Sequence, residues 1–218
     1  MRRVLLFDID GTLIASSNQI EPVHYTVMKS RGCVNFPISD ESSGLTDWDL
    51  LVLINSLNAN KVSDPDLENC FTELDNAYLE KLQSATISTC VGVNKNNLCL
   101  LSKSFELGIL TGNTKERTSL KISQANLDDY FKPELRFSAQ SRESRNSLAE
   151  RAGNQLNLPA KDVILIGDTP KDIQAAQNAG FSSIAVATGK HSLEKLITFN
   201  PDVAISNLED GISKILHF

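Results

Sequence analysis

The chain has 218 residues, a net charge of −6 and four cysteines, enough to bury a sizeable core as one domain or as one with a large insertion. The acidic balance and the absence of a Lys/Arg run argue against nucleic acid or an anionic membrane as a partner. No apolar stretch reaches the roughly 18 residues of a membrane span, and the cysteines lack metal-site spacing, so we expect free thiols in a cytoplasmic protein.

The first predicted element is a strand over residues 4–7, where four consecutive apolar residues are typical of burial on both faces. Asp8 and Asp10 follow it, and alternate residues of a strand point the same way. At roughly 4 Å two such charges repel by about 1 kcal/mol in water and about 4 at an effective dielectric of 20. The pair therefore indicates a divalent cation. Gly11 supplies a tight turn, and Thr12 offers a hydroxyl and an amide to an anion; a polar turn without a ligand is the alternative.

Residues 15–85 have helical rather than strand periodicity and predict a compact all-helical insertion. A first helix would begin at Glu21-Pro22 and end at Gly32. A second would cover 48–54 with Thr46 or Asp47 as its cap, and a third would cover 66–82.

Strands and helices alternate in the rest of the chain. The predicted strands are 105–110, 162–166, 183–187 and 201–205, and the predicted helices are 96–103, 115–126, 144–156 and one ending at Ala179, with an irregular connection over 131–137. This order predicts an α/β fold, a doubly wound, Rossmann-like parallel sheet with helices on both faces. We expect residues 1–14 and 86–218 to form that core domain and residues 15–85 the helical domain.

In such a sheet the functional site lies at the carboxyl ends of the strands. Three strand ends carry polar residues that packing does not need: Asp8 with Asp10, Thr111-Gly112-Asn113, and Gly167-Asp168 with Asp172. Together they predict one site at this edge. His24, His191 and His217 are scattered in the sequence, and we expect them to be surface or packing residues.

These stretches resemble the haloacid dehalogenase superfamily over nearly the whole chain. Its first motif is matched by Asp8-Ile9-Asp10-Gly11-Thr12, its second by Thr111 and its acidic fourth by Gly167-Asp168-Thr169-Pro170-Lys171-Asp172. The helical insertion resembles the mobile cap of the phosphoglycolate-phosphatase-like branch, and Gly44-Leu45-Thr46-Asp47 resembles a segment found there. Gly44, Thr46 and Asp47 are therefore candidate substrate or cap contacts, with helix capping as the alternative for the last two.

The third motif departs from the family pattern, which usually has a Lys at the start of the helix before the acidic strand. Arg145 lies near that place, with Arg142 three residues earlier and Lys132 farther away. We expect Arg145 to take the role, since a guanidinium holds phosphate and carboxylate together. A solvated arginine at a helix start is the alternative.

The resemblance implies a Mg²⁺-dependent hydrolase of a small phosphorylated metabolite. Asp8 would attack phosphorus and form a phosphoaspartate, and Asp10 would act first as general acid and then as general base. Asp8 would be ionised while Asp10 held a proton. Mg²⁺ would bind Asp8, Asp10 through its backbone carbonyl, and Asp168, with support from Asp172. The phosphoryl group would be held by Thr111, Gly112, Asn113 and Arg145, with Gly11 and Thr12 beside it.

Other functions fit less well. Dehalogenases of the superfamily lack the second aspartate, so Asp10 favours phosphoryl transfer. A phosphosugar mutase shares these core residues, and no residue of the insertion indicates one. A response-regulator receiver domain carries its acceptor on a middle strand, unlike Asp8, and a non-catalytic relative is disfavoured because every core acid is present. The substrate and the oligomeric state stay open.

Overall fold

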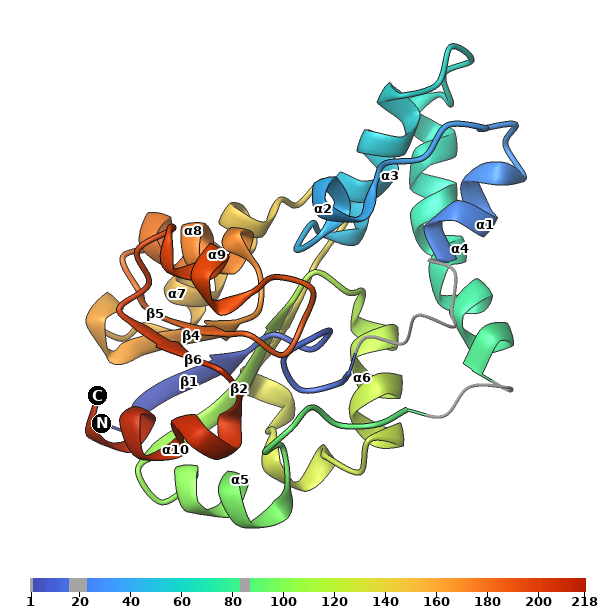
Figure 1. The fold of residues 1–218 in the computed structure, drawn as a ribbon. Coiled ribbons are helices and arrows are strands. Elements are labelled where there is room, and N and C mark those ends of the chain that lie inside the picture. The colour runs from blue at the N-terminus through green and yellow to red at the C-terminus, as the bar shows by residue number, and fades with distance from the viewer. Residues whose placement is uncertain (1, 16–22, 83–86) are drawn as a thin grey trace.

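The computed structural model describes residues 2–15, 23–82 and 87–218, which are built around one parallel sheet (Figure 1). The strands are β1 (Arg3–Phe7), β2 (Phe105–Thr111), β3 (Arg136–Ser138), β4 (Val163–Gly167), β5 (Ser182–Val186) and β6 (Val203–Ile205). Their order is β3-β2-β1-β4-β5-β6. The central strand β1 pairs with β2 on one side and β4 on the other, where Leu5 aligns with Leu107 and Ile164. Because strand order reverses at β1, the sheet is doubly wound as predicted.

Helices cover both faces of the sheet. Leu5 and Phe7 belong to the apolar cluster of α5 (Lys95–Leu101), α6 (Lys115–Gln124) and α10 (Leu208–His217). Val4 and Leu6 join the cluster of α7 (Arg145–Leu156) and α8 (Pro170–Ala179). This alternation follows from the period of two along a strand. The short helix α9 (Leu193–Ile197) packs through Leu196 near β5.

The segment between β1 and α5 is helical in its described part. It contains α1 (Val23–Lys29), α2 (Ser39–Ser42), α3 (Asp47–Ser56) and α4 (Asp64–Leu82), here called the inserted helices, which lie to one side of the sheet (Figure 1). They share their own apolar cluster, in which Met28 and Leu51 are fully buried. Trp48 belongs to it, its ring centre 6.1 Å from that of Phe71. The predicted start of the first helix at Glu21-Pro22 and the boundary at 85–86 lie outside the described residues.

Some elements differ from the sequence predictions. Helices α9 and α10 were not predicted, although Ser192 and Asn207 cap their N-termini. The predicted irregular connection contains a short regular strand, β3, preceded by 3₁₀ turns η1 (Asp128–Tyr130) and η2 (Pro133–Leu135); a third, η3 (Ala160–Asp162), precedes β4.

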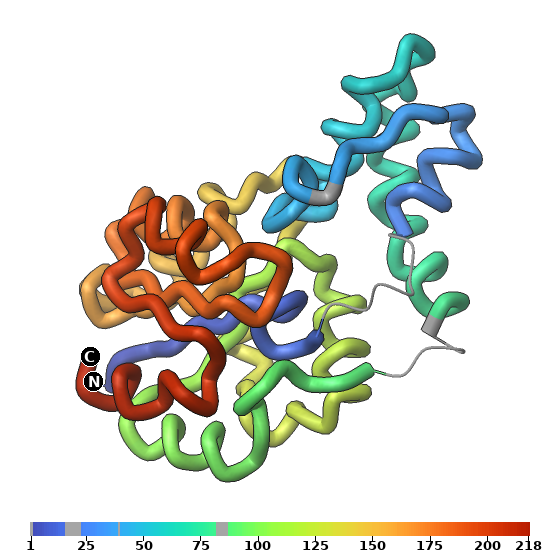
Figure 2. The backbone as a smooth tube through the Cα atoms, viewed as in Figure 1, coloured from blue at the N-terminus to red at the C-terminus, as the bar shows by residue number. Residues whose placement is uncertain are grey.

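The two ends of the chain meet beside the sheet, as Figure 2 shows. The guanidinium carbon of Arg3 lies 5.4 Å from the ring centre of Phe218. Within the described ranges, no helix combines the length and apolar character needed to cross a bilayer.

Candidate active site

Three buried carboxylates meet where β1 and β4 end. One oxygen from each of Asp8, Asp168 and Asp172 lies within 4.8 Å of the others. Asp8 directly follows β1, Asp168 directly follows β4, and Asp172 is in the first turn of α8. The sequence predicted that these acids lie at one edge, and the structure brings them together. Asp172 is further held by Thr169, whose backbone N–H and hydroxyl donate to its Oδ2 at 3.0 and 2.7 Å.

Burial makes this carboxylate cluster electrostatically costly. It raises the pKa of Asp8 to about 6, although Arg145 opposes the shift. Burial and the charges of Asp8 and Asp172 also raise the pKa of Asp168 well above its usual value. Both shifts arise because the charged forms are poorly solvated and repel one another.

Arg145 partly offsets this charge. It lies at the start of α7 and donates to Asp8 Oδ1 at 2.9 Å and also to Asp172. Its Nε–H is buried and has no acceptor among the described residues. A buried donor without an acceptor is costly, so Arg145 has unused capacity for an anion.

The alternatives for the basic residue lie elsewhere. Arg142 is exposed and pairs with Glu68 of α4 at 2.7 Å. Lys132 is exposed and pairs with Glu106 at 2.8 Å. Of the three basic candidates, Arg145 alone contacts the carboxylate cluster.

Asp10 has different neighbours from Asp8. Both of its carboxylate oxygens accept from Lys121 Nζ, Oδ1 at 2.7 Å and Oδ2 at 2.5 Å. Asn113 Nδ2 donates to Oδ2 at 2.8 Å. The Asp10 side chain is 48% exposed. Its partial removal from water would raise its pKa, but the charge and hydrogen bonds of Lys121, with that of Asn113, lower it below its usual value.

The pKa shifts of the first two acids therefore run opposite to the expected ones, although a pKa of about 6 still leaves Asp8 mostly ionised at neutral pH. The sequence predicted an ionised Asp8 and a protonated Asp10. Instead the pKa of Asp8 is raised and that of Asp10 is lowered. The reason is that Lys121, which the sequence analysis did not identify, neutralises Asp10, whereas Asp8 is buried among other acids.

The end of β2 contributes the hydroxyl of its last residue, Thr111. Thr111 Oγ1 accepts from the backbone N–H and the Nδ2 of Asn113, at 3.3 and 2.8 Å. Among the described residues, none accepts the hydroxyl proton of Thr111, so this proton is free for a ligand. Asn113 is fully engaged, since its Oδ1 also accepts from Arg117 and Lys121 at 2.9 Å each.

The turn after β1 supports the acids. Gly11 has φ +87°, and a Cβ there would collide with the carboxylate of Asp168. The hydroxyl of Thr12 donates to Asp168 Oδ1 at 3.1 Å, while the N–H groups of Gly11 and Thr12 donate to Ile14 and Ile9 carbonyls. These donors serve the turn and Asp168, and their predicted contact with phosphate stays a prediction.

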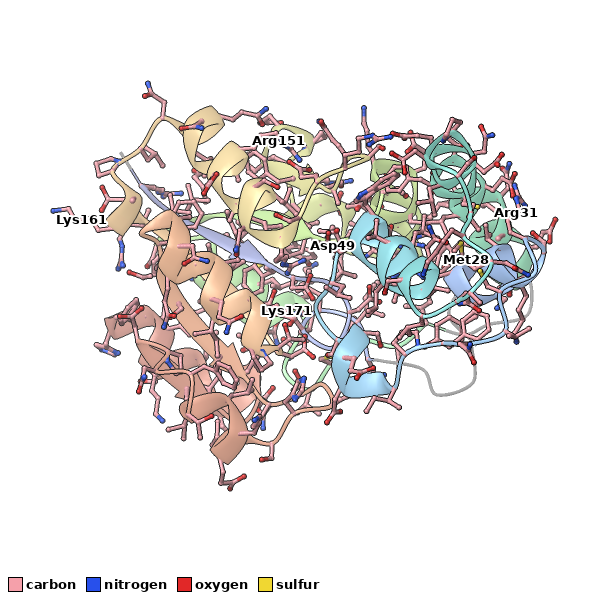
Figure 3. The ribbon with its side chains drawn as sticks, turned by 90° about the horizontal axis from the view of Figure 1, so that it is seen from above. Met28, Arg31, Asp49, Arg151, Lys161 and Lys171 are labelled. Carbon is pink, nitrogen blue, oxygen red and sulfur yellow. The ribbon has the colours of Figure 1, made fainter. Side chains whose placement is uncertain are left out.

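The inserted helices contact the strand ends through the segment before α3. Thr46 caps α3 by accepting from Asp49 N–H, and its hydroxyl donates to the Glu143 carbonyl at 2.7 Å. The Asp47 N–H donates to the Gly112 carbonyl at 2.8 Å, and a Cβ on Gly112 would meet this segment. In Figure 3, Asp49 of α3 and Lys171 of α8 mark where the inserted helices approach the rest of the molecule.

Gly44 belongs to the same contact. It has φ +72°, and a Cβ there would collide with Thr169 at the start of α8. The three candidate substrate contacts, Gly44, Thr46 and Asp47, thus lie where the inserted helices meet the rest of the molecule.

A second group of buried charges lies beside the first and was missed from the sequence. Asp47 Oδ2 accepts from Thr114 N–H at 2.9 Å, and its Oδ1 accepts from Arg117 of α6 and lies 3.0 Å from His24 Nε2. His24 is therefore a buried partner of a carboxylate, and the surface alternative is wrong for it. The available signal was the four-residue spacing of Arg117 and Lys121, which places them on one face of a helix.

The carboxylate cluster fits a divalent cation. When ionised, three carboxylates with one guanidinium would leave two negative charges in a buried place, and a cation there would favour that ionised state. Carboxylate oxygens are the ligands that Mg²⁺ prefers. The carboxylate of Asp10 lies outside the cluster and is held by Lys121, so a metal contact from this residue would use its backbone carbonyl.

The sequence matches known proteins along most of its length. The model of the family described as Haloacid dehalogenase-like hydrolase matches residues 5–186. The pyrophosphatase PpaX of Anoxybacillus flavithermus is 23% identical over 96% of this chain and 94% of its own. The phosphoglycolate phosphatase of Colwellia psychrerythraea is 23% identical over 92% of this chain and 91% of its own.

Solved structures share the fold. A hydrolase from Pseudomonas syringae superposes with a TM-score of 0.80 at 17% identity, covering 100% of this chain and 99% of its own. This likeness supports both the doubly wound core and the placement of a helical insertion after β1.

Proposed function

The chain belongs to the haloacid dehalogenase-like hydrolases, and from this premise we propose that it hydrolyses the phosphomonoester of a small phosphorylated metabolite through a phosphoaspartate. The observation that carries the proposal is the buried cluster of Asp8, Asp168 and Asp172 with Arg145 donating to two of them. The curated relatives support it, because they are named as phosphatases.

In the first step an oxygen of Asp8 attacks phosphorus. A new bond forms between that oxygen and phosphorus, and the bond from phosphorus to the leaving oxygen breaks. Because Lys121 lowers the pKa of Asp10, this carboxyl must first take up a proton when the substrate binds; it then passes that proton to the leaving oxygen, which departs as an alcohol. The free Nε–H of Arg145 and the free hydroxyl proton of Thr111 would donate to the phosphoryl oxygens, where charge gathers.

In the second step water attacks the phosphoaspartate. Asp10 takes a proton from the water, the new oxygen–phosphorus bond forms, and the bond to Asp8 breaks. Inorganic phosphate leaves and the Asp8 carboxylate is restored.

Asp8, Asp168 and the backbone carbonyl of Asp10 would hold the metal, with Asp172 in support. Bound Mg²⁺ would act as a Lewis acid at the phosphoryl oxygens and neutralise their charge. A cation there would also favour the charged, nucleophilic form of Asp8.

We further propose that residues 15–85 form a cap domain over a core of residues 1–14 and 86–218. The separate apolar cluster of the inserted helices supports this division. The contacts of Thr46 and Asp47 with Glu143 and Gly112 would hold the cap down and exclude water during phosphoryl transfer.

A substrate panel tests the proposal. Purified protein would be assayed for phosphate release from sugar phosphates, phosphoglycolate and pyrophosphate, with Mg²⁺ and with a chelator. The last two belong in the panel because relatives carry those names. We expect metal-dependent turnover of at least one phosphomonoester, abolished in Asp8→Asn. An absence of turnover across the panel, or an active Asp8→Asn protein, would refute the proposal.

A further inference from the structure

Lys121 is a buried cation whose entire hydrogen-bonding capacity is used at the active site. Its ammonium has three donors, and the structure gives it three acceptors: both oxygens of Asp10, at 2.7 and 2.5 Å, and Asn113 Oδ1 at 2.9 Å. The residue is only 7% exposed. No motif of the sequence analysis includes it.

The contacts determine where the Asp10 carboxylate lies. Asp8 and Asp10 both follow β1, yet the carboxylate of Asp10 is absent from the group formed by Asp8, Asp168 and Asp172. It is bound instead from the side of α6, by Lys121 and by Asn113 Nδ2. Three neighbouring acids repel it from one side while the ammonium attracts it from the other.

A second row of contacts holds Lys121 and Asn113 in place. Arg117, one turn before Lys121 on α6, donates to Asn113 Oδ1 at 2.9 Å and also pairs with Asp47. The ring of Tyr78 from α4 lies over both cations, with its centre 5.6 Å from the Arg117 guanidinium carbon and 5.3 Å from Lys121 Nζ. One of the inserted helices, α4, therefore also contacts Lys121.

We propose that Lys121 is a positioning residue for Asp10, holding its carboxylate away from the metal-binding acids and toward the leaving group of the substrate. The inference rests on the proposed function, in which Asp10 carries the proton. Lys121 itself touches neither phosphorus nor metal in this arrangement. Its ammonium is fully engaged by protein acceptors, which argues against a primary role in substrate binding.

Leaving-group dependence tests this role. A general acid accelerates departure of a poor leaving group, by about 10²-fold to 10⁴-fold, and does little for a good one. Lys121→Met keeps an unbranched side chain only one atom shorter and removes its charge. We expect its kcat to fall by about 10²-fold on an alkyl phosphate and much less on 4-nitrophenyl phosphate, with KM nearly unchanged. Lys121→Arg should recover part of the loss.

Two comparisons make the test specific. Lys115→Met removes an exposed lysine from the same helix and should leave both substrates unaffected. The double variant Asp10→Asn, Lys121→Met should lose no more than Asp10→Asn alone, because the two residues act as a unit. Equal losses on both substrates, a loss confined to KM, or additive losses in the double variant would overturn the inference.

Crystal structures separate this inference from the proposed function. We expect the carboxylate of Asp10 to turn away from its wild-type position in Lys121→Met and to keep it in Lys115→Met. An unmoved Asp10 would overturn the positioning role even in an active enzyme. If the wild-type protein hydrolyses no phosphoester, the proposed function fails, and these structures alone decide whether Lys121 positions Asp10.

Discussion

Asp47, the first residue of α3, and Arg117, in the first turn of α6, form a buried ion pair that joins the inserted helices to the helix following β2. Both side chains are at most 6% exposed. Burial would raise the pKa of Asp47, but Arg117 and His24 hold it well below its usual value. Both side chains are thus charged, and each buried charge is stabilised by the other.

Removing one half of this pair should be strongly destabilising. We expect Arg117→Met to lower the free energy of unfolding by about 3–5 kcal/mol, because it leaves the Asp47 charge buried without its partner. Arg142→Met breaks the exposed pair with Glu68 and should cost far less, because water screens that pair. Urea titrations of both variants measure the difference. Similar losses in the two would contradict the assignment of a buried, interdependent pair.

The basic residue of the site should be Arg145 rather than Arg142. We expect Arg145→Ala to lower kcat by about 10²-fold to 10³-fold, as for loss of one donor to a developing charge. Arg145→Lys should retain more activity, since an ammonium keeps the charge near the single nitrogen, Nη2, that bonds both Asp8 and Asp172, but lacks the free Nε–H. Arg142→Ala is the control. The assignment fails if Arg142→Ala loses more activity than Arg145→Ala, measured on proteins with unchanged circular dichroism.

Metal binding should stabilise the protein through the carboxylate cluster. At 100 times its dissociation constant, Mg²⁺ adds about 2.7 kcal/mol, or roughly 5–10 °C in Tm for a chain of this size. Asp168→Asn should lose most of that shift, and Asp129→Asn, an exposed control, should keep it. Thermal unfolding with Mg²⁺ and with a chelator measures this.

A second prediction concerns the stability of the wild type and of Asp168→Asn without metal. Because the pKa of Asp168 is raised by burial and by Asp8 and Asp172, its charge opposes folding at neutral pH. Metal-free Asp168→Asn should therefore be at least as stable as the metal-free wild type. A variant that is clearly less stable without metal would show that Asp168 has a structural role unrelated to a cation.

The strand ends were predictable because their chemistry is local. Asp8, Thr111 and Asp168 each follow a short apolar run, and parallel strands bring such positions to one edge. Arg145 could be proposed from its place before the acidic strand. These predictions need only the order of elements along the chain.

The second group of charges was not predictable in the same way. Spacing places Arg117 and Lys121 on one face of α6, but not which face meets the strand ends. The partners of His24 and Lys121 come from distant segments, Asp47 and Asp10. Such contacts depend on how α6, α1 and α3 pack, which periodicity alone does not determine. The opposite pKa shifts of Asp8 and Asp10 were not predicted for the same reason, because they depend on the contact between Lys121 and Asp10.

His24 should make stability depend on pH. It is buried in α1, its Nε2 lies 3.0 Å from Asp47 Oδ1, and the other charges that act on it are Arg117 and Lys121 of α6. Burial lowers its pKa below the usual 6.5, although Asp47 opposes the shift. Between the folded and unfolded pKa values the unfolded chain binds more protons. The contribution of His24 is therefore present above pH 6.5 and lost as the pH falls below it.

The variant His24→Gln isolates this effect. Its amide cannot titrate, whereas Asp8 and Asp168 titrate in both proteins and cancel in the comparison. We expect the wild type to lose about 1 kcal/mol more than His24→Gln between pH 7.5 and 5.5, since one pKa unit corresponds to roughly 1.4 kcal/mol. His217→Gln, at the exposed end of α10, should follow the wild type. Unfolding free energies from urea titrations at both pH values measure the difference, and parallel pH profiles for wild type and His24→Gln would show that His24 titrates normally in the folded protein.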